Sequence, residues 1–135
     1  MPDELFAMGQ TALAAQPFSV LMGATLRVFA PGRAELELPL KPEFAQQHGF
    51  AHGGVISYLA DNAISFVGGS LLGIDVLTAG YTINYVQPGQ GARLIARASV
   101  VAATGRQAVC RCEVFGERDG QEYLCAAAQG TIVKR

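Results

Sequence analysis

The spacing of apolar and polar residues divides the first third of the chain into a helix and a strand pair. Residues 2–13 carry acids at the start and an apolar side, which predicts a short helical segment that ends at Pro17. Residues 24–30 and 34–38 follow, and the second of these alternates apolar and charged positions. With a turn at Pro31-Gly32, they predict a hairpin with one solvated face. Residues 41–52 are read as a polar loop.

The pattern changes to helical periodicity over residues 54–71. One side of this helix is apolar and comprises Val55, Ile56, Leu59, Ala63 and Phe66. Another side is a narrow stripe of small and polar residues: Gly54, Ser57, Asp61, Ser65 and Gly68. Asp61 is the only acidic or basic residue in the segment, whereas a helix facing solvent carries several. We therefore expect a central, surrounded helix that keeps Asp61 largely away from bulk water.

The second half of the chain reads as strands at 76–86, 93–101, 107–114 and 123–133, separated by turn residues. This order predicts an antiparallel meander of four strands. The whole chain, residues 1–135, is then a single α+β domain in which a six-stranded antiparallel sheet wraps around one long helix. One helix cannot cover both faces of a sheet or protect both of its edges, so we expect a homodimer that continues the sheet at an edge.

Composition and charge exclude several classes of protein. Half of the residues are apolar and 16% are charged, which excludes intrinsic disorder. The net charge is -1 without a basic cluster, so no nucleic-acid surface is expected. No stretch offers about 18 uninterrupted apolar residues, and the first residues do not resemble a signal peptide. We expect a cytoplasmic protein that does not act in a membrane.

The three cysteines do not indicate a metal or redox site. Cys110, Cys112 and Cys125 are odd in number and lack a metal-binding spacing. We interpret them as small buried apolar residues in a reducing compartment, and no metal or other cofactor is implied.

Two glycines, Gly53 and Gly54, stand where the central helix begins. The first amides of a helix have no partner within it, and the helix dipole adds partial positive charge there. This arrangement suits an oxyanion, although a plain glycine turn into a helix explains the same residues. His52 precedes them, and both a catalytic and a loop-orienting role fit it.

Asp61 lies two turns beyond Gly54 on the same side of the helix, about 10 Å away at 1.5 Å per residue. It cannot touch a group bound at its own helix start, whereas a two-fold partner could supply the closer pairing. Asp61 fits a nucleophile or general base. It also fits a buried aspartate bonded to Ser57 or Ser65, or an interface residue.

Other polar residues give weaker signals. No Gly-x-Ser-x-Gly motif or triad arrangement supports a serine hydrolase. Arg106, in a turn, fits a phosphate ligand or a solvated strand end. Thr78 and Tyr85 are interpreted first as strand residues.

The run His52-Gly53-Gly54, with Leu59, Asp61 and Ala63, resembles the His-Gly-Gly…Leu-x-Asp-x-Ala signature of hotdog-fold acyl-CoA thioesterases. It is most similar to the phenylacetate-pathway and 4-hydroxybenzoyl-CoA-type branch, and residues 83–88 resemble the strand of that branch that ends in Tyr-x-x-Pro. The order of elements matches over nearly the whole chain. The resemblance implies hydrolysis of an acyl-CoA or related thioester to a carboxylic acid and a free thiol. It also implies a homodimer that packs into a tetramer.

The resemblance implies catalytic roles for particular residues. The thioester oxygen accepts the N–H of Gly53, with Gly54 as a further contact. The carboxylate of Asp61 comes from the neighbouring subunit, either as nucleophile or as general base. His52 orients the loop and the thioester, and Thr78 stands where some relatives carry a serine that helps to position water.

Gln46 departs from the family pattern, because relatives often carry Asn or Asp six residues before the histidine. Its amide is one methylene longer, so either the site tolerates the longer reach or Gln47 or His48 shares the role. Three further residues are expected to contact substrate: Asn62, Ser65 and Arg106.

Two other functions are compatible with this fold. Hydroxyacyl-thioester dehydratases and hydratases use a histidine with an acid on the helix, and a non-enzymatic module would bind acyl-CoA without turnover. The His-Gly-Gly run favours hydrolysis. Measuring thiol release against the change in enoyl absorbance separates the two enzyme classes.

Overall fold

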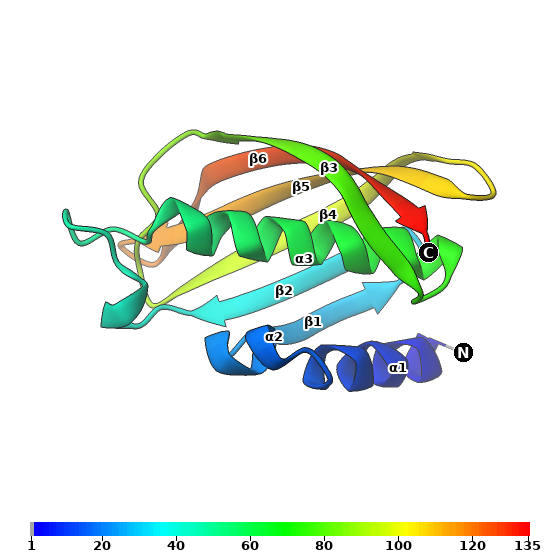
Figure 1. Ribbon diagram of the computed structural model, residues 1–135. Helices are drawn as coiled ribbons and strands as arrows, with labels where there is room; N and C mark the ends of the chain where they lie inside the picture. The colour runs from blue at the N-terminus through cyan, green and yellow to red at the C-terminus, as the bar shows by residue number, and fades with distance from the viewer. Residues whose placement is uncertain (1) are drawn as a thin grey trace.

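The computed structural model describes residues 2–135, and its sheet and central helix confirm the expected α+β architecture (Figure 1). The helices are α1 (Pro2–Ala14), α2 (Pro17–Met22) and α3 (Gly53–Leu72), with a 3-10 turn at Pro42–Phe44. The strands are β1 (Thr25–Ala30), β2 (Arg33–Pro39), β3 (Val76–Tyr85), β4 (Arg93–Ala103), β5 (Gln107–Arg118) and β6 (Gln121–Lys134). They form one antiparallel sheet in the order β1-β2-β4-β5-β6-β3.

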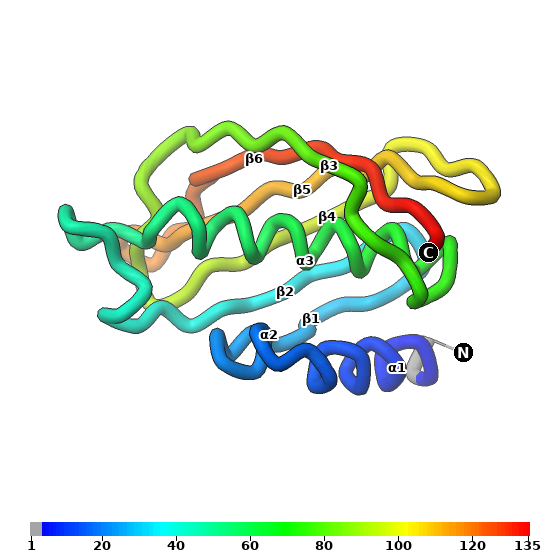
Figure 2. The backbone as a smooth tube through the Cα atoms, in the orientation of Figure 1, coloured from blue at the N-terminus to red at the C-terminus, as the bar shows by residue number. Residues whose placement is uncertain are grey.

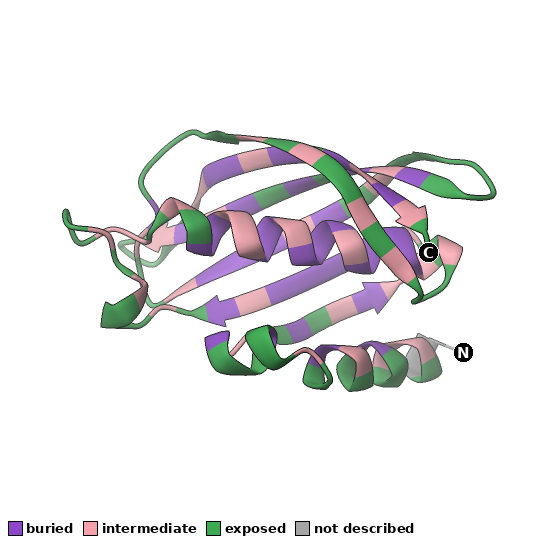
Figure 3. Ribbon diagram, in the orientation of Figure 1, coloured by how far each residue is buried: buried purple, intermediate pink, exposed green. Residues whose placement is uncertain are grey.

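The core lies between α3 and the inner face of the sheet, which curves around the helix (Figure 3). Eleven of the twenty residues of α3 are buried. Phe66 on α3 meets Phe29 on β1 edge to face, with 5.4 Å between ring centroids. By length and hydropathy α3 could span a membrane, but 61% of its apolar window is buried inside the protein, as expected of a core helix.

The predicted four-strand meander is wrong, because β3 and β4 are not neighbours. β3 pairs with β6 at one edge, and β4 lies between β2 and β5. After β3 the chain runs down one end of the molecule and enters the middle of the sheet as β4 (Figure 2). Alternation within a strand selects the face that is buried and does not select the pairing partner, so local spacing could not reveal this crossover.

The N-terminal segment also differs from the prediction, since Pro17 does not end the helical region. α1 ends at Ala14, and Pro17 occupies the start of α2, where a missing N–H costs nothing. Gly23 closes α2 with φ +86°, a left-handed conformation that favours glycine.

The outer face of the sheet is covered by ion pairs. Arg97 on β4 donates to Glu122 on β6 through two nitrogens, at 2.7 and 3.1 Å, and lies 3.5 Å from Glu35 on β2. The hydrogen bond from Arg97 holds the pKa of Glu122 below its usual value. Arg97 thus links β4 both to its neighbour β2 and to β6, which lies on the far side of β5.

The three cysteines are buried, as expected, and none of them forms a disulfide. Burial raises the pKa of the Cys112 thiol to about 12, so the reactive thiolate is scarce at neutral pH.

Two adjacent glycines in α3 are expected to differ sharply in their tolerance of alanine. A Cβ on Gly68 would lie 2.7 Å from Ile132 Cβ, whereas one on Gly69 meets nothing closer than Val76 Cγ2 at 3.6 Å. Gly68→Ala should lower the free energy of unfolding by roughly 1–3 kcal/mol through overpacking. Gly69→Ala should leave it unchanged or raise it by up to about 1 kcal/mol, because alanine favours the helix. Urea denaturation tests this pair, and equal effects of the two variants would contradict the packing described.

Candidate active site

The start of α3 presents a single free backbone amide. His52 caps the helix, and its Nδ1 accepts the N–H of Gly54 at 2.8 Å. Its carbonyl oxygen accepts the N–H of Val55 at 2.9 Å. Within residues 2–135, the N–H of Gly53 has no recorded acceptor. The oxyanion role therefore fits Gly53 alone, because Gly54 already donates to the cap.

The cap also defines the state of the imidazole. Because Nδ1 of His52 accepts a hydrogen bond, it carries no proton, and a neutral ring then carries its proton on Nε2. The hydrogen bond ties the His52 ring to the backbone at the start of α3, and His52 is otherwise exposed.

Tyr85 is a site residue that the sequence analysis interpreted only as part of a strand. Its hydroxyl donates to the carbonyl oxygen of Gly53 at 3.1 Å. The peptide unit between Gly53 and Gly54 is thus held at both ends, by Tyr85 at its oxygen and by His52 at its nitrogen. The Tyr-x-x-Pro resemblance was the only signal in the sequence that could have pointed to Tyr85.

A cleft of about 440 Å³ opens beside the helix start. Gln46, His48, Phe50, Gly53 and Tyr85 are among its lining residues. The side-chain oxygen of Gln46 accepts the N–H groups of His48 at 2.7 Å and Phe50 at 3.2 Å. This oxygen shapes the loop, so the NH₂ group of Gln46 is the part that remains for a ligand.

Asp61 lies half-buried in the middle of α3 and faces β3. Its Oδ1 accepts the hydroxyl of Thr78 at 2.7 Å, and the hydroxyls of Thr78 and Ser65 are 2.9 Å apart. A threonine hydroxyl has one hydrogen, so Ser65 must donate to Thr78. The partner of Asp61 is therefore a strand residue rather than Ser57 or Ser65, and Ser57 instead contacts the hydroxyl of Tyr81.

Within one chain, the structure keeps Asp61 apart from the free amide. Gly53 and Asp61 are eight positions apart on α3, which is about 12 Å at 1.5 Å per residue. The chain therefore has two half-sites, one at the helix start and one at mid-helix.

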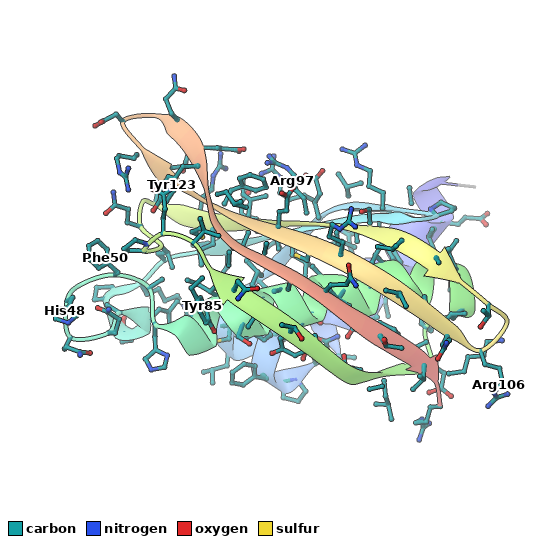
Figure 4. The ribbon with its side chains drawn as sticks, turned by 90° about the horizontal axis from the view of Figure 1, so that it is seen from above. His48, Phe50, Tyr85, Arg97, Arg106 and Tyr123 are labelled. Carbon is teal, nitrogen blue, oxygen red and sulfur yellow. The ribbon has the colours of Figure 1, made fainter. Side chains whose placement is uncertain are left out.

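Two of the expected substrate-binding residues lie outside both half-sites. Asn62 is 9% exposed, and it donates to Ser19 Oγ at 3.1 Å and to the hydroxyl of Tyr58 at 3.3 Å, which ties α3 to α2. Arg106 is exposed in the β4–β5 turn, at the opposite end of the molecule from His48, Phe50 and Tyr85 (Figure 4). Across the described part of the chain, no group of three or more potential metal ligands lies together.

Comparison with known proteins identifies the family. Residues 48–123 match the family model of the thioesterase superfamily. A thioesterase family protein from Silicibacter pomeroyi is 33% identical, with 91% of this chain and 92% of that chain covered and a TM-score of 0.87. A variant of the phenylacetic acid degradation protein PaaI from Thermus thermophilus is 30% identical, with 89% and 100% covered and a TM-score of 0.77.

The fold also extends to more distant relatives. The PaaI protein of Escherichia coli, from the phenylacetic acid degradation operon, is 18% identical and has a TM-score of 0.87 over 99% of this chain and 95% of its own. No curated protein sequence matches the chain. The chain belongs to the thioesterase superfamily and has the hotdog fold of that family. This membership supports thioester hydrolysis as its general chemistry.

Amide hydrogen exchange should report the restraint on the helix start. The N–H of Gly53 should exchange fast, and that of Gly54 should be protected by His52. Tyr85→Phe removes one hydrogen bond, worth about 1 kcal/mol, and should speed exchange at Gly54 by roughly fivefold. Tyr81→Phe, which loses the contact to Ser57 instead, is the matched control and should leave Gly54 unchanged. Equal exchange at Gly54 in wild type and Tyr85→Phe would show that Tyr85 does not restrain this peptide.

Proposed function

We propose that this protein hydrolyses an acyl-CoA thioester to a carboxylic acid and free CoA, as a homodimer with two composite active sites. The observation that carries the proposal is the free N–H of Gly53 beside a cleft, together with the hydrogen-bonded carboxylate of Asp61. Within one chain, Asp61 lies too far along α3 to reach a group bound at Gly53. In each site, Gly53 of one subunit binds the thioester oxygen, and Asp61 of the partner subunit faces the carbonyl carbon.

Gly53 stabilises the charge that develops on the oxygen. When a nucleophile attacks the carbonyl carbon, the oxygen becomes an oxyanion, and a fixed N–H at a helix start favours that charge. Losing one such donor typically costs about 100- to 1000-fold in rate. His52 and Tyr85 keep this part of the backbone in place, which avoids reorganisation during the reaction.

Asp61 supplies the electron pair by one of two routes. Thr78 occupies Oδ1, which leaves the other oxygen to react. In the first route, this oxygen attacks the carbonyl carbon and expels the thiolate, and water then cleaves the resulting anhydride. In the second route, this oxygen takes a proton from a water molecule that attacks the carbonyl carbon and expels the thiolate. Both routes consume one water and release one acid and one thiol.

The edge strand β3 supports pairing with a second copy. Leu77 on β3 is 56% exposed, and Ile74 before it is 54% exposed, which are large values for apolar side chains at a sheet edge. A two-fold pairing at this edge would bring the Arg106 end of one chain toward the cleft end of the other, where Arg106 could meet a CoA phosphate. The family resemblance extends this to a tetramer made of two dimers, with a cytoplasmic location.

Asp61→Asn should reduce kcat for thioester hydrolysis by at least roughly 1000-fold, because the amide can neither attack nor accept a proton. Thiol release from an acyl-CoA measures this rate. Asp119→Asn is the matched control, since Asp119 is exposed in the turn between β5 and β6, away from the edge proposed to pair. Near-normal turnover by a folded, dimeric Asp61→Asn variant would refute the role of Asp61.

A mixing experiment tests whether each site draws on two subunits. Gly53→Pro removes the amide hydrogen at a helix position that tolerates proline, and His52 already has the extended backbone, φ -59° and ψ 139°, that precedes proline. Each homodimer of Gly53→Pro or Asp61→Asn should be nearly inactive.

After subunit exchange at equal amounts, half of the dimers contain one chain of each kind, and each has one intact site of two. The mixture should therefore recover about a quarter of the wild-type activity. If both residues acted within one chain, no mixed dimer would hold a complete site, and activity would not return.

A further inference from the structure

A second cavity lies one helical turn beyond Asp61, on the side away from the start of α3. It has a volume of about 100 Å³ and lies between α1, β1, the second half of α3 and the start of β3. Its apolar walls are Ala12, Phe29, Phe66, Ile74 and Val76. Ser65 and Gln16 add polar groups, and Gly69 contributes no side chain.

The cavity is joined to the carboxylate through Ser65. This residue lines the cavity, and its hydroxyl donates to Thr78, which donates to Asp61. Ser65 follows Asp61 by four residues, so the two side chains are neighbours on one face of α3. The cavity therefore begins within one helical turn of the carboxylate, next to the place where a carbonyl carbon at Asp61 would lie.

The direction of the substrate follows from the two half-sites. In the proposed function, on which this inference rests, the thiol part of the thioester lies in the cleft at the partner's Gly53. The acyl chain leaves the carbonyl carbon in the other direction, which is along α3 from Asp61 toward Gly69. That is where the cavity lies.

We propose that this cavity is the acyl pocket and that it selects short aliphatic acyl groups over aromatic ones. Phe29 and Phe66 are 3% and 6% exposed and pack edge to face, so they form a wall that cannot retreat without disturbing the core. An engineered apolar cavity of about 150 Å³ holds a benzene ring. A cavity of about 100 Å³ is smaller than that and suits a few methylene groups.

Two substitutions change the volume of the pocket in opposite directions. Gly69→Ala adds a methyl group that lies 3.6 Å from Val76 Cγ2 and 3.8 Å from Ile74 Cα, so it fits without a clash and narrows the cavity. Ile74→Ala removes part of the wall without threatening the core, because the Ile74 side chain is exposed. Ile74 also lies at the edge proposed to pair with a second copy, so size-exclusion chromatography verifies that this variant remains a dimer. Leu71→Ala is the matched control, because Leu71 is an exposed apolar residue near the cavity that does not line it.

The experiment measures kcat/KM by thiol release for acetyl-, butyryl-, hexanoyl- and phenylacetyl-CoA with the full-length dimer. The wild type should prefer the short aliphatic substrates to phenylacetyl-CoA. Gly69→Ala should lose activity on hexanoyl-CoA relative to acetyl-CoA, by about fourfold per methylene no longer accommodated. Ile74→Ala should raise kcat/KM for hexanoyl- and phenylacetyl-CoA, relative to acetyl-CoA, by a similar factor. Leu71→Ala should keep the wild-type profile.

The outcomes separate this inference from the function on which it rests. A wild type that hydrolyses none of the four substrates overturns the proposed function and the pocket with it. A wild type that prefers phenylacetyl-CoA, or a profile that is the same in wild type, Gly69→Ala and Ile74→Ala, overturns the pocket and leaves thioester hydrolysis standing.

Discussion

The hydrogen bond between Thr78 on β3 and Asp61 on α3 is the contact on which the rest of the structure depends. A carboxylate on an otherwise apolar core helix is costly unless it has a partner. The edge strand supplies that partner, and the same strand places Tyr81 against Ser57 and Thr78 against Ser65. The polar stripe of α3 is therefore satisfied by one strand, while its apolar sides remain free to pack into the sheet.

The same edge strand ends at the other half-site. β3 begins beside Asp61 and finishes at Tyr85, whose hydroxyl holds the carbonyl of Gly53. One strand thus positions both the carboxylate and the helix start, and it keeps them apart along the helix. The proposed composite site starts from this separation, because two-fold symmetry is the simplest way to bring unlike ends of identical helices together.

The match to the family model covers both α3 and β3. The thioesterase superfamily model matches the region from the loop before α3 through β5 and into β6. That region contains both half-sites, whereas α1 and α2 lie before it. Ala12 of α1 and Gln16, with Phe29 of β1, form one side of the cavity beyond Asp61, and the rest of its lining lies within the matched region. The proposed acyl pocket thus combines residues of the matched region with residues that precede it, which allows the substrate to vary while the chemistry is kept.

Local sequence was enough to predict the elements and to name candidate reacting groups, because periodicity, turn residues and helix-start glycines act over a few residues. The central helix, the strands and the candidates Gly53 and Asp61 could all be recognised in this way. Three long-range features could not be recognised from local sequence. These are the placement of β3 beside β6, the hydrogen bond from Thr78 to Asp61 and the hydrogen bond from Tyr85 to the carbonyl oxygen of Gly53. They join residues 17 to 58 positions apart, and alternation along a strand does not determine its neighbour. Asn62 is a further example. Only the tertiary structure reveals that its amide donates a hydrogen bond to Ser19 on α2.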